Sequence, residues 1–252
     1  MNTPTRSRWA GAVVLASALL AAETLTGCAG SSTSANVDPQ TKVDAASTPS
    51  RTFSHPGRID NRYLPITKTK RCELRGTAND GTIEKSDKTV LPQRKAFEVD
   101  GKRVEAVVVR DNAYEDGKLI ESTLDYFAQS DEGTVYYLGE QVKNIESGEV
   151  VNTDGTWLYG QDTDRLGVAM PPAPKVGQQW HLEDVPGLTT ESNRVEETHL
   201  RTKVLGRLMT DVIRVQEFIQ PEGEVEYKLY AAGVGTVAEY PPDARVFLVG
   251  CR

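Results

Sequence analysis

Histidine, cysteine and methionine are scarce in this chain of 252 residues, which contains three of each. The dispersed His55, His181 and His199 lack the paired spacing of a zinc site, so we expect no metal ion. The sequence also lacks a Gly-x-Ser-x-Gly elbow, a phosphate-binding glycine loop and a catalytic Cys-His signature. These absences predict a protein that is not an enzyme and that carries no cofactor.

Basic residues are outnumbered, because 29 Lys and Arg stand against 36 Asp and Glu and give a formal net charge of −7. An acidic domain gains nothing from a phosphate backbone or from an anionic membrane surface. We therefore expect no nucleic acid partner, and no membrane contact beyond an anchor.

Apolar runs long enough for a transmembrane helix are also absent. The longest run, Trp9 to Ala22, has about 14 residues, whereas a helix needs roughly 20 to cross a bilayer. It follows Arg6 and Arg8 and ends at Glu23, which is the layout of a secretory signal. We predict that residues 1–27 are this signal.

The signal ends in the motif Leu25-Thr26-Gly27-Cys28. This motif resembles the lipobox of bacterial lipoproteins, in which the cysteine receives a diacylglycerol thioether before the signal is removed. The resemblance implies a mature chain that begins at Cys28 and is anchored by two or more acyl chains on the extracytoplasmic face of the cell membrane, or on the outer membrane of a Gram-negative envelope. The alternative is an ordinary signal followed by an incidental or buried cysteine.

Residues 28–55 are rich in Ser, Thr, Ala and Pro and have no apolar periodicity. Such a segment cannot build a core, so we predict a flexible tether with a reach of roughly 25–30 Å. Residues 56–252 are enough for one core, and we expect a single domain there.

Lipidation of Cys28 would leave Cys72 and Cys251, an even number for an oxidising compartment. A disulfide between them would close a loop that spans nearly the whole domain, and long loops give the larger entropic stabilisation. Two free buried thiols are the alternative.

Glycine turns divide the chain from Thr67 onward into short β-branched and aromatic stretches. Asp-Gly and related pairs between apolar runs indicate tight hairpins. The turns are Asn79-Asp80-Gly81, Asp100-Gly101, Asp116-Gly117, Asp131-Glu132-Gly133, Ser147-Gly148, Asp154-Gly155 and Glu222-Gly223. They predict a mainly β fold, an antiparallel meander in which strands pair with their sequence neighbours.

Three segments indicate how the strands are placed. Val104 to Val109 is rich in apolar residues, as in a central strand, whereas Val212 to Phe218 alternates like a half-exposed strand. Thr189 to Leu205 is the only candidate for a helix, and its Thr, Asn and Val favour a strand.

The two halves of the domain are similar. Leu124 to Gln129 followed by Gly133-Thr134-Val135 is echoed, roughly 100 positions later, by Lys228 to Gly233 followed by Gly235-Thr236-Val237. We predict a duplication, about 60–160 and 168–252, that forms a sandwich or an open or half barrel. Chance similarity among hairpins is the alternative.

Several of these segments together resemble an uncharacterised family of secreted bacterial β-rich proteins, to which no reaction is assigned. The shared features are Asn61-Arg62-Tyr63-Leu64-Pro65, Val108-Val109-Arg110-Asp111, Tyr114-Glu115-Asp116-Gly117, Asp125-Tyr126-Phe127-Ala128-Gln129, Pro174-Lys175-Val176-Gly177 and Gly233-Val234-Gly235-Thr236-Val237. Cys72 departs from the family, which tends to have an aromatic residue there, so the resemblance does not imply the disulfide.

Aromatic residues gather on the β segments at Tyr126, Phe127, Tyr136, Trp157 and Tyr159. As the wall of a binding site they would suit an apolar or saccharide ligand. As ordinary core they would fill the interior of a β fold, and this is the commoner use of such residues.

The combined features predict a lipid-anchored extracytoplasmic β domain that acts as a noncatalytic binding or interaction module of the cell envelope. Its partner would be an envelope protein or a small apolar ligand. One alternative is a carrier or sensor of lipid or other apolar ligands, with a cavity in a half barrel. The other is a hydrolase with an unrecognised carboxylate pair, which the abundant acidic residues allow but do not locate.

Overall fold

The computed structural model describes residues 51–221 and 223–252, so the predicted signal, Cys28 and most of the predicted tether lie outside the described residues. Within those residues the chain forms fourteen β-strands and one short 3₁₀ turn, η1. The elements are η1 (Ile66–Lys68), β1 (Arg71–Ala78), β2 (Ile83–Val99), β3 (Lys102–Glu115), β4 (Lys118–Gln129), β5 (Val135–Glu146), β6 (Glu149–Asn152), β7 (Trp157–Leu158), β8 (Gly167–Met170), β9 (Gln179–Val185), β10 (Thr189–Val204), β11 (Arg207–Gln220), β12 (Glu224–Ala231), β13 (Gly235–Tyr240) and β14 (Ala244–Cys251).

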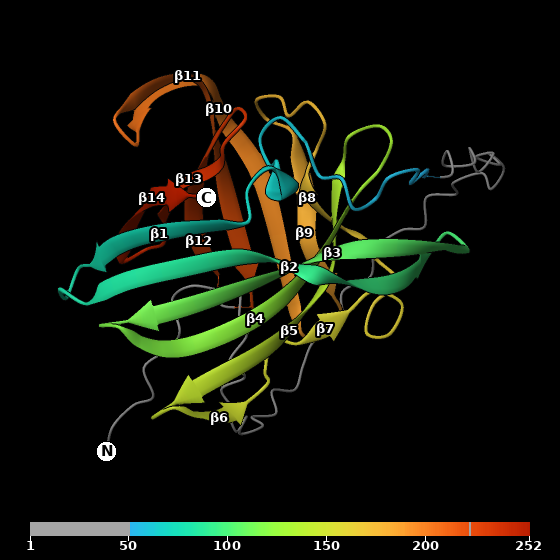
Figure 1. Cartoon of the computed structure of the whole chain (residues 1–252), viewed down its shortest axis with the longest axis horizontal. Helices are drawn as coiled ribbons and strands as arrows, with labels where there is room; N and C mark the ends of the chain where they lie inside the picture. Colours follow the sequence, from blue (N-terminus) through green and yellow to red (C-terminus); the bar gives the residue numbers. More distant parts are fainter. Residues whose placement is uncertain (1–50, 222) are drawn as a thin grey trace, which may run out of the picture. The chain divides into compact units, whose positions relative to one another are not determined.

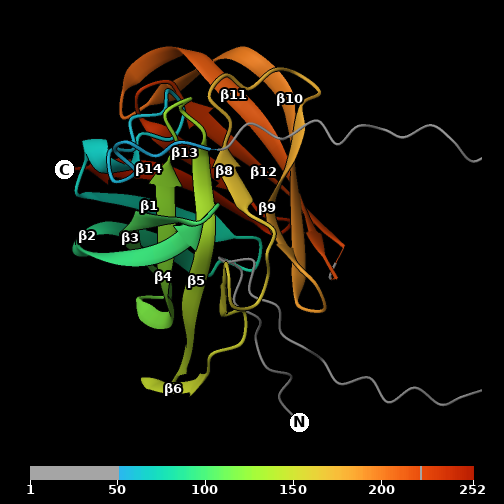
Figure 2. The same cartoon turned by 90° about the vertical axis from the view of Figure 1, so that its right-hand side faces the viewer.

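The strands form one antiparallel meander sheet in the order β6-β5-β4-β3-β2-β1-β14-β13-β12-β11-β10-β9, with β7 and β8 paired to β5 (Figure 1). The first and last strands, β1 and β14, pair at the middle of this order. The sheet is strongly curved but not closed by hydrogen bonds, and its two halves face each other across an interior (Figure 2). The predicted fold class, a mainly β antiparallel meander that forms a sandwich or an open or half barrel, is therefore confirmed.

Tight hairpins explain why sequence neighbours pair. Asp100 and Gly101 have φ values of 51° and 72°, and Asp116 and Gly117 have 47° and 79°. Two successive residues with positive φ form the type I′ turn, whose twist matches that of antiparallel strands. The window predicted as strand rather than helix is β10, which pairs with β11 and β9.

Strand β3 is buried on both faces, as its apolar composition predicts. Val107 and Val109 point into the interior core, which also contains Trp157 and Met170. Val104, Ala106 and Val108 point to the opposite face, because successive side chains of a strand alternate, and they belong to a second core. The second core contains Phe97, Val99, Val104, Ala106, Val108, Tyr126, Ala128 and Leu138.

Two glycines allow short strands to approach β5 and β9 closely. A Cβ on Gly139 of β5 would lie 2.4 Å from the carbonyl oxygen of Trp157 in β7. A Cβ on Gly167 of β8 would lie 2.1 Å from the carbonyl oxygen of Leu182 in β9. Because β8 is also paired with β5, it lies between the two halves and closes the interior on that side.

A disulfide joins Cys72 of β1 to Cys251 of β14, which are register partners with Cα atoms 4.1 Å apart. The bridge therefore links the two halves at their shared seam. No helix in residues 51–221 and 223–252 has the length and apolarity to span a membrane.

Candidate functional site

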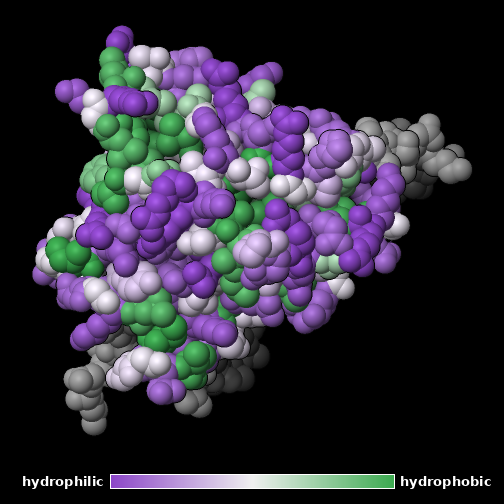
Figure 3. Space-filling view, in the orientation of Figure 1, coloured by the Kyte–Doolittle hydropathy of each residue, from purple (hydrophilic) through white to green (hydrophobic). Residues whose placement is uncertain are grey.

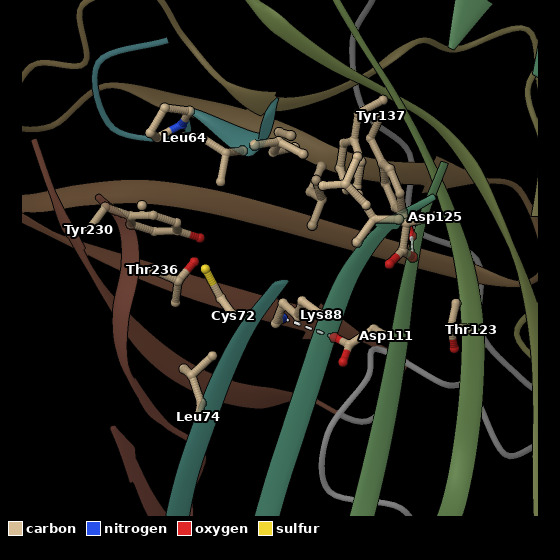
Figure 4. Close-up of a pocket in the computed structure, with 18 of the residues that line it drawn as sticks. Leu64, Cys72, Leu74, Lys88, Asp111, Thr123, Asp125, Tyr137, Tyr230 and Thr236 are labelled. Carbon is tan, nitrogen blue, oxygen red and sulfur yellow. Dashed lines mark hydrogen bonds and ion pairs between the residues drawn. The ribbon is translucent and has the colours of Figure 1, made fainter. Parts of the chain in front are cut away.

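A cavity of about 230 Å³ lies on the concave side of the sheet, between the two halves. Figure 4 shows side chains from both halves entering it, with Tyr230 and Thr236 on one side and Asp125 and Tyr137 on the other. Its volume equals that of roughly eight water molecules in the liquid. The cavity is thus large enough for a small organic molecule.

One wall of the cavity is apolar and aromatic. The rings of Phe127 and Tyr137 stack with centroids 4.9 Å apart, and Trp157 packs edge-on against Tyr137 at 5.4 Å. Val90 and Val109 extend this wall along β2 and β3. The wall offers a ligand apolar surface that is held in place by the interior core.

One end of the cavity is covered by residues 59–68, which we call the cap; its Leu64, Pro65 and Ile66 line the cavity. Asn61 fixes this segment. Its Nδ2 donates to the carbonyl oxygens of Gly133 (2.9 Å) and Pro171 (3.0 Å), and its Oδ1 accepts from the backbone N–H groups of Tyr63 (2.9 Å) and Leu64 (3.1 Å). A buried amide that makes four hydrogen bonds orients the cap rigidly.

The cap is also tied to the second half of the chain. Tyr63 donates to Asp211 at 2.7 Å, and Arg62 forms an ion pair with the same carboxylate. Lys68 Nζ donates to the carbonyl oxygen of Gly233 at 2.5 Å. Burial favours the protonated form of Asp211, but the hydrogen bonds from Tyr63 and Arg62 outweigh it and hold its pKa below the usual value.

Ionisable side chains form much of the remaining lining. Within the described part of the chain, six carboxylates line the cavity: Asp111, Glu121, Asp125, Glu140, Glu183 and Glu191. Lys88 lies among them, with Nζ 3.0 Å from Asp111 and 3.4 Å from Glu239 (Figure 4). Lys70 and Arg71 also line the cavity, and Arg71 forms an ion pair with Asp87. Outside the lining, Lys228 of β12 lies 2.5 Å from Glu217. Such a lining is unusual, because charged groups are rarely placed inside a protein without a functional reason.

Burial raises the pKa of three of these carboxyl groups, Asp125, Glu140 and Glu183. Burial raises the pKa of Asp125 to about 7, and the charge of Asp111 adds to the effect. Burial likewise raises the pKa of Glu183 to about 7 and that of Glu140 well above its usual range. A hydrogen bond between Glu140 and Glu183 favours the protonated form of Glu140 and the ionised form of Glu183. Of the two carboxyl groups, Glu140 is therefore the one that holds a proton more readily.

Two side chains of β10 that line the cavity each have a buried oxygen without a hydrogen-bond partner in the described structure. Glu191 is 4% exposed and Asn193 is 2% exposed, and both line the cavity. Their side-chain oxygens Oε1 and Oδ1 are buried without a partner. Burial raises the pKa of Glu191 well above its usual range, and the nearby Glu217 raises it further. Buried acceptors are nearly always paired in native proteins, so this pair points to a group that the cavity receives.

The predicted aromatic wall is divided by strand alternation. Of its five residues, Phe127 lines the cavity and Trp157 lies behind Tyr137 in the interior core. Tyr126 and Tyr159 belong to or pack against the second core, and Tyr136 is half-buried beside Phe53. Cys72 also lines the cavity, whereas Cys28 lies outside the described residues.

Sequence reasoning missed the charged lining, although a signal for it exists. On β3, Val107, Val109 and Asp111 follow one another on the inner face, and on β11 Ile213, Val215 and Glu217 do the same. Each half thus carries two apolar residues and then an acidic one at every second position. The signal for a polar interior was an acidic residue on the same strand face as the buried apolar residues, two positions further along the strand.

The described residues contain no group of three or more His, Cys, Asp and Glu side chains arranged to hold a metal ion. Comparison of this chain with protein-family models, with characterised proteins and with solved structures finds no match.

Proposed function

We propose that this protein is a noncatalytic binding domain of the bacterial cell envelope that holds a small molecule in its capped cavity. The observation that carries the proposal is the cavity itself, which combines an aromatic wall with buried polar atoms that have no partner. A site with a mostly apolar surface and a few convergent polar groups is typical of small-molecule recognition.

The size of the cavity favours a small ligand over a lipid. Ligand pockets usually measure about 300–1,000 Å³, and this cavity is about 230 Å³. The carboxylates that line it would also repel a fatty acid headgroup. The apolar-ligand carrier considered from the sequence is therefore the weaker of the two binding functions.

Exposed apolar residues give less support to a protein–protein docking function. Figure 3 shows apolar side chains in separate patches among hydrophilic ones on the face it presents. Large exposed apolar residues occur in several strands and turns: Ile83, Val150, Val151, Val176, Leu205, Leu208, Phe218, Val225, Phe247 and Val249. Scattered apolar residues are normal on a protein surface and indicate no particular partner.

The test of ligand binding is native mass spectrometry of the full chain purified from its own cells. We expect an adduct of a small molecule that is lost on denaturation. Val90→Phe places a larger side chain in the cavity from β2 and should remove the adduct, whereas Ile83→Phe, on the exposed part of the same strand, should keep it. A bare protein mass in both variants and in the wild type would contradict the proposal.

The location in the envelope is proposed on the lipobox-like motif Leu25-Thr26-Gly27-Cys28. Intact mass spectrometry of the membrane fraction should give a chain that begins at Cys28 and carries a diacylglyceryl group. Cys28→Ser should release the protein from the membrane, because the anchor is the single strong membrane contact that the sequence provides. A chain that retains residues 1–27 would overturn this part of the proposal.

One observation favours a second candidate, a hydrolase. Glu140 and Glu183 both line the cavity, and burial raises the pKa of Glu183 to about 7 and that of Glu140 well above its usual range. Paired carboxyl groups with separated pKa values act as general acid and base in many hydrolases. If this candidate is correct, nitrophenyl esters or glycosides should be hydrolysed with a pH profile that changes near 7, and Glu140→Gln should abolish it. Hydrolysis no faster than in buffer from pH 5 to 8 would exclude these substrates.

A further inference from the structure

We propose that the cavity selects a small organic cation, a protonated primary amine on an apolar body, and that Glu191 and Asn193 hold its ammonium group. This inference rests on the proposed binding function and adds the chemical class of the ligand. Three independent features of the lining support it: the charge balance, the unpartnered acceptors and the aromatic wall.

The charge balance of the lining leaves room for a cation. The lining contains three basic residues, Lys70, Arg71 and Lys88, against six carboxylates. Lys88 is engaged by Asp111 and Glu239, and Arg71 is engaged by Asp87. Lys228, which is not part of the lining, is engaged by Glu217. The remaining carboxyl groups with no lysine or arginine of the described chain at ion-pair distance are Asp125, Glu140, Glu183 and Glu191. A buried carboxyl group without a counter-ion is stabilised either by protonation or by binding of a cation.

The geometry of the unpartnered atoms specifies what kind of cation fits. Glu191 Oε1 and Asn193 Oδ1 are both acceptors, and they stand two residues apart on β10, so they face the same side of the strand. A primary ammonium group has three N–H donors and can serve both acceptors at once. A quaternary ammonium has no N–H group and would leave both oxygens unpaired.

The surroundings of Glu191 supply a strong negative potential. Glu191 faces Glu183 of β9, Glu217 of β11, and Glu226 and Lys228 of β12. Lys228 is the one cation in this set, and Glu217 already pairs with it. A bound ammonium group would reduce the net negative charge of these side chains. The attraction between the ammonium group and the carboxylates is larger in the low dielectric of a cavity than at the surface.

The rest of the cavity fits an apolar body of modest size. Tyr230 and Phe127 offer ring surface, and Val90, Val109 and Leu182 offer aliphatic surface. Aromatic rings also attract a nearby cation through their negative faces. A hydrocarbon chain of about six carbons matches a cavity of about 230 Å³.

The experiment is isothermal titration of the full chain with hexylamine, 1-hexanol and hexanoate at pH 7.5. We expect hexylamine to bind at least tenfold more tightly than hexanol, and hexanoate not to bind. Glu191→Gln should weaken hexylamine binding at least tenfold and weaken hexanol binding much less, because glutamine keeps an oxygen acceptor but has no negative charge. The matched control Glu196→Gln, a carboxylate of the same strand outside the cavity, should change neither.

Asn193→Leu and the pH dependence give second readouts in case Glu191→Gln unfolds the chain. Asn193→Leu removes one acceptor and should weaken hexylamine binding severalfold. In the wild type, hexylamine binding should tighten between pH 5.5 and 8, because the facing carboxyl groups become ionised, whereas hexanol binding should stay constant.

The outcomes separate this inference from the proposed function. Hexanol or hexanoate binding that equals or exceeds hexylamine binding, and that Val90→Phe abolishes, would overturn the cation preference and support a binding cavity. Equal hexylamine affinities of the wild type and Glu191→Gln would overturn the assignment of Glu191. Failure of every probe, together with a bare native mass, would overturn both proposals.

Discussion

The two faces of the first half of the sheet differ in composition, although the same strands form both. The inner face lines the cavity, and the outer face carries the second core. In the second core, Val104, Val108 and Leu138 are fully or almost fully buried. On the inner face, Val107 and Val109 of β3 belong to the interior core, and Asp111 and other carboxylates next to them line the cavity. The outer face stabilises the sheet through burial of apolar area. The inner face keeps ionisable groups near one another at a cost to stability, which is typical of sites that bind or react.

The largest expected effect concerns a buried ion pair of the inner face. Lys228→Met leaves the carboxylate of Glu217, which is 1% exposed, without its cation. Removal of one partner of a buried pair destabilises a protein by about 3–5 kcal/mol. Urea unfolding at pH 7 should show this loss.

The double variant Lys228→Met, Glu217→Gln tests the cause of that loss. It removes both charges together, so most of the lost stability should return. If the double variant is as unstable as the single one, packing of the lysine stem and not charge would be responsible.

The stability contributed by the second core should depend on the apolar volume that is buried there and not on pH. Leu138→Ala removes a fully buried side chain and should lower the free energy of unfolding by about 2–5 kcal/mol at every pH. Val151→Ala, at a position that is 49% exposed, should change it by less than about 0.5 kcal/mol. A pH-dependent effect of Leu138→Ala would mean that the two faces are not independent.

The inner face should make stability depend on pH. Glu226 has a pKa of about 8 because of burial, against 4.5 for a free side chain, and Asp125 and Glu183 have values of about 7. The folded state then binds more protons than the unfolded state between about pH 4 and 8, so stability is highest near pH 4 and falls as the pH rises to 8. Urea unfolding at pH 5 and at pH 8 should show this decrease.

Glu226→Gln should remove part of that decrease. The variant has no carboxylate to bury at high pH, so it should be more stable than the wild type at pH 8 by on the order of 2 kcal/mol, and similar to it at pH 4. The control Glu149→Gln lies on the exposed strand β6 and should leave the pH profile unchanged. Parallel profiles for the wild type and Glu226→Gln would show that Glu226 does not titrate as proposed.

The smallest expected loss of stability concerns the hairpin turns, which belong to neither face of the sheet. Gly101→Ala places a side chain at a φ of 72°, which costs about 1 kcal/mol for an L-residue. Gly57→Ala, at a glycine without positive φ, tests whether the effect is conformational. Thermal unfolding should show a lower midpoint for Gly101→Ala and little change for Gly57→Ala.

Local patterns were enough to predict the strands and their neighbours. Asp100-Gly101 and Asp116-Gly117 adopt the positive φ values that hairpins need, so the order of pairing follows from the chain itself. The burial of β3 on both faces follows from its run of valines. The anchor at Cys28 and the duplication of the halves stay predictions.

The binding site could not be assembled from the sequence in the same way. Asn61, Gly133 and Pro171 are distant in the chain, yet one amide side chain joins them at the cap. Glu191 and Asn193 alternate on β10 like polar residues of any half-exposed strand. Their burial depends on β9, β11 and β12, which bring other carboxyl groups against them.

By itself, the sequence determined the antiparallel meander, because turn conformation and the two-residue period of strands are local properties of the chain. Only the tertiary structure decided which of the polar faces surrounds a cavity and which one meets water. The physical reason is that alternation gives a side chain its face, whereas the curvature of the sheet and the position of the cap determine the solvent that this face meets.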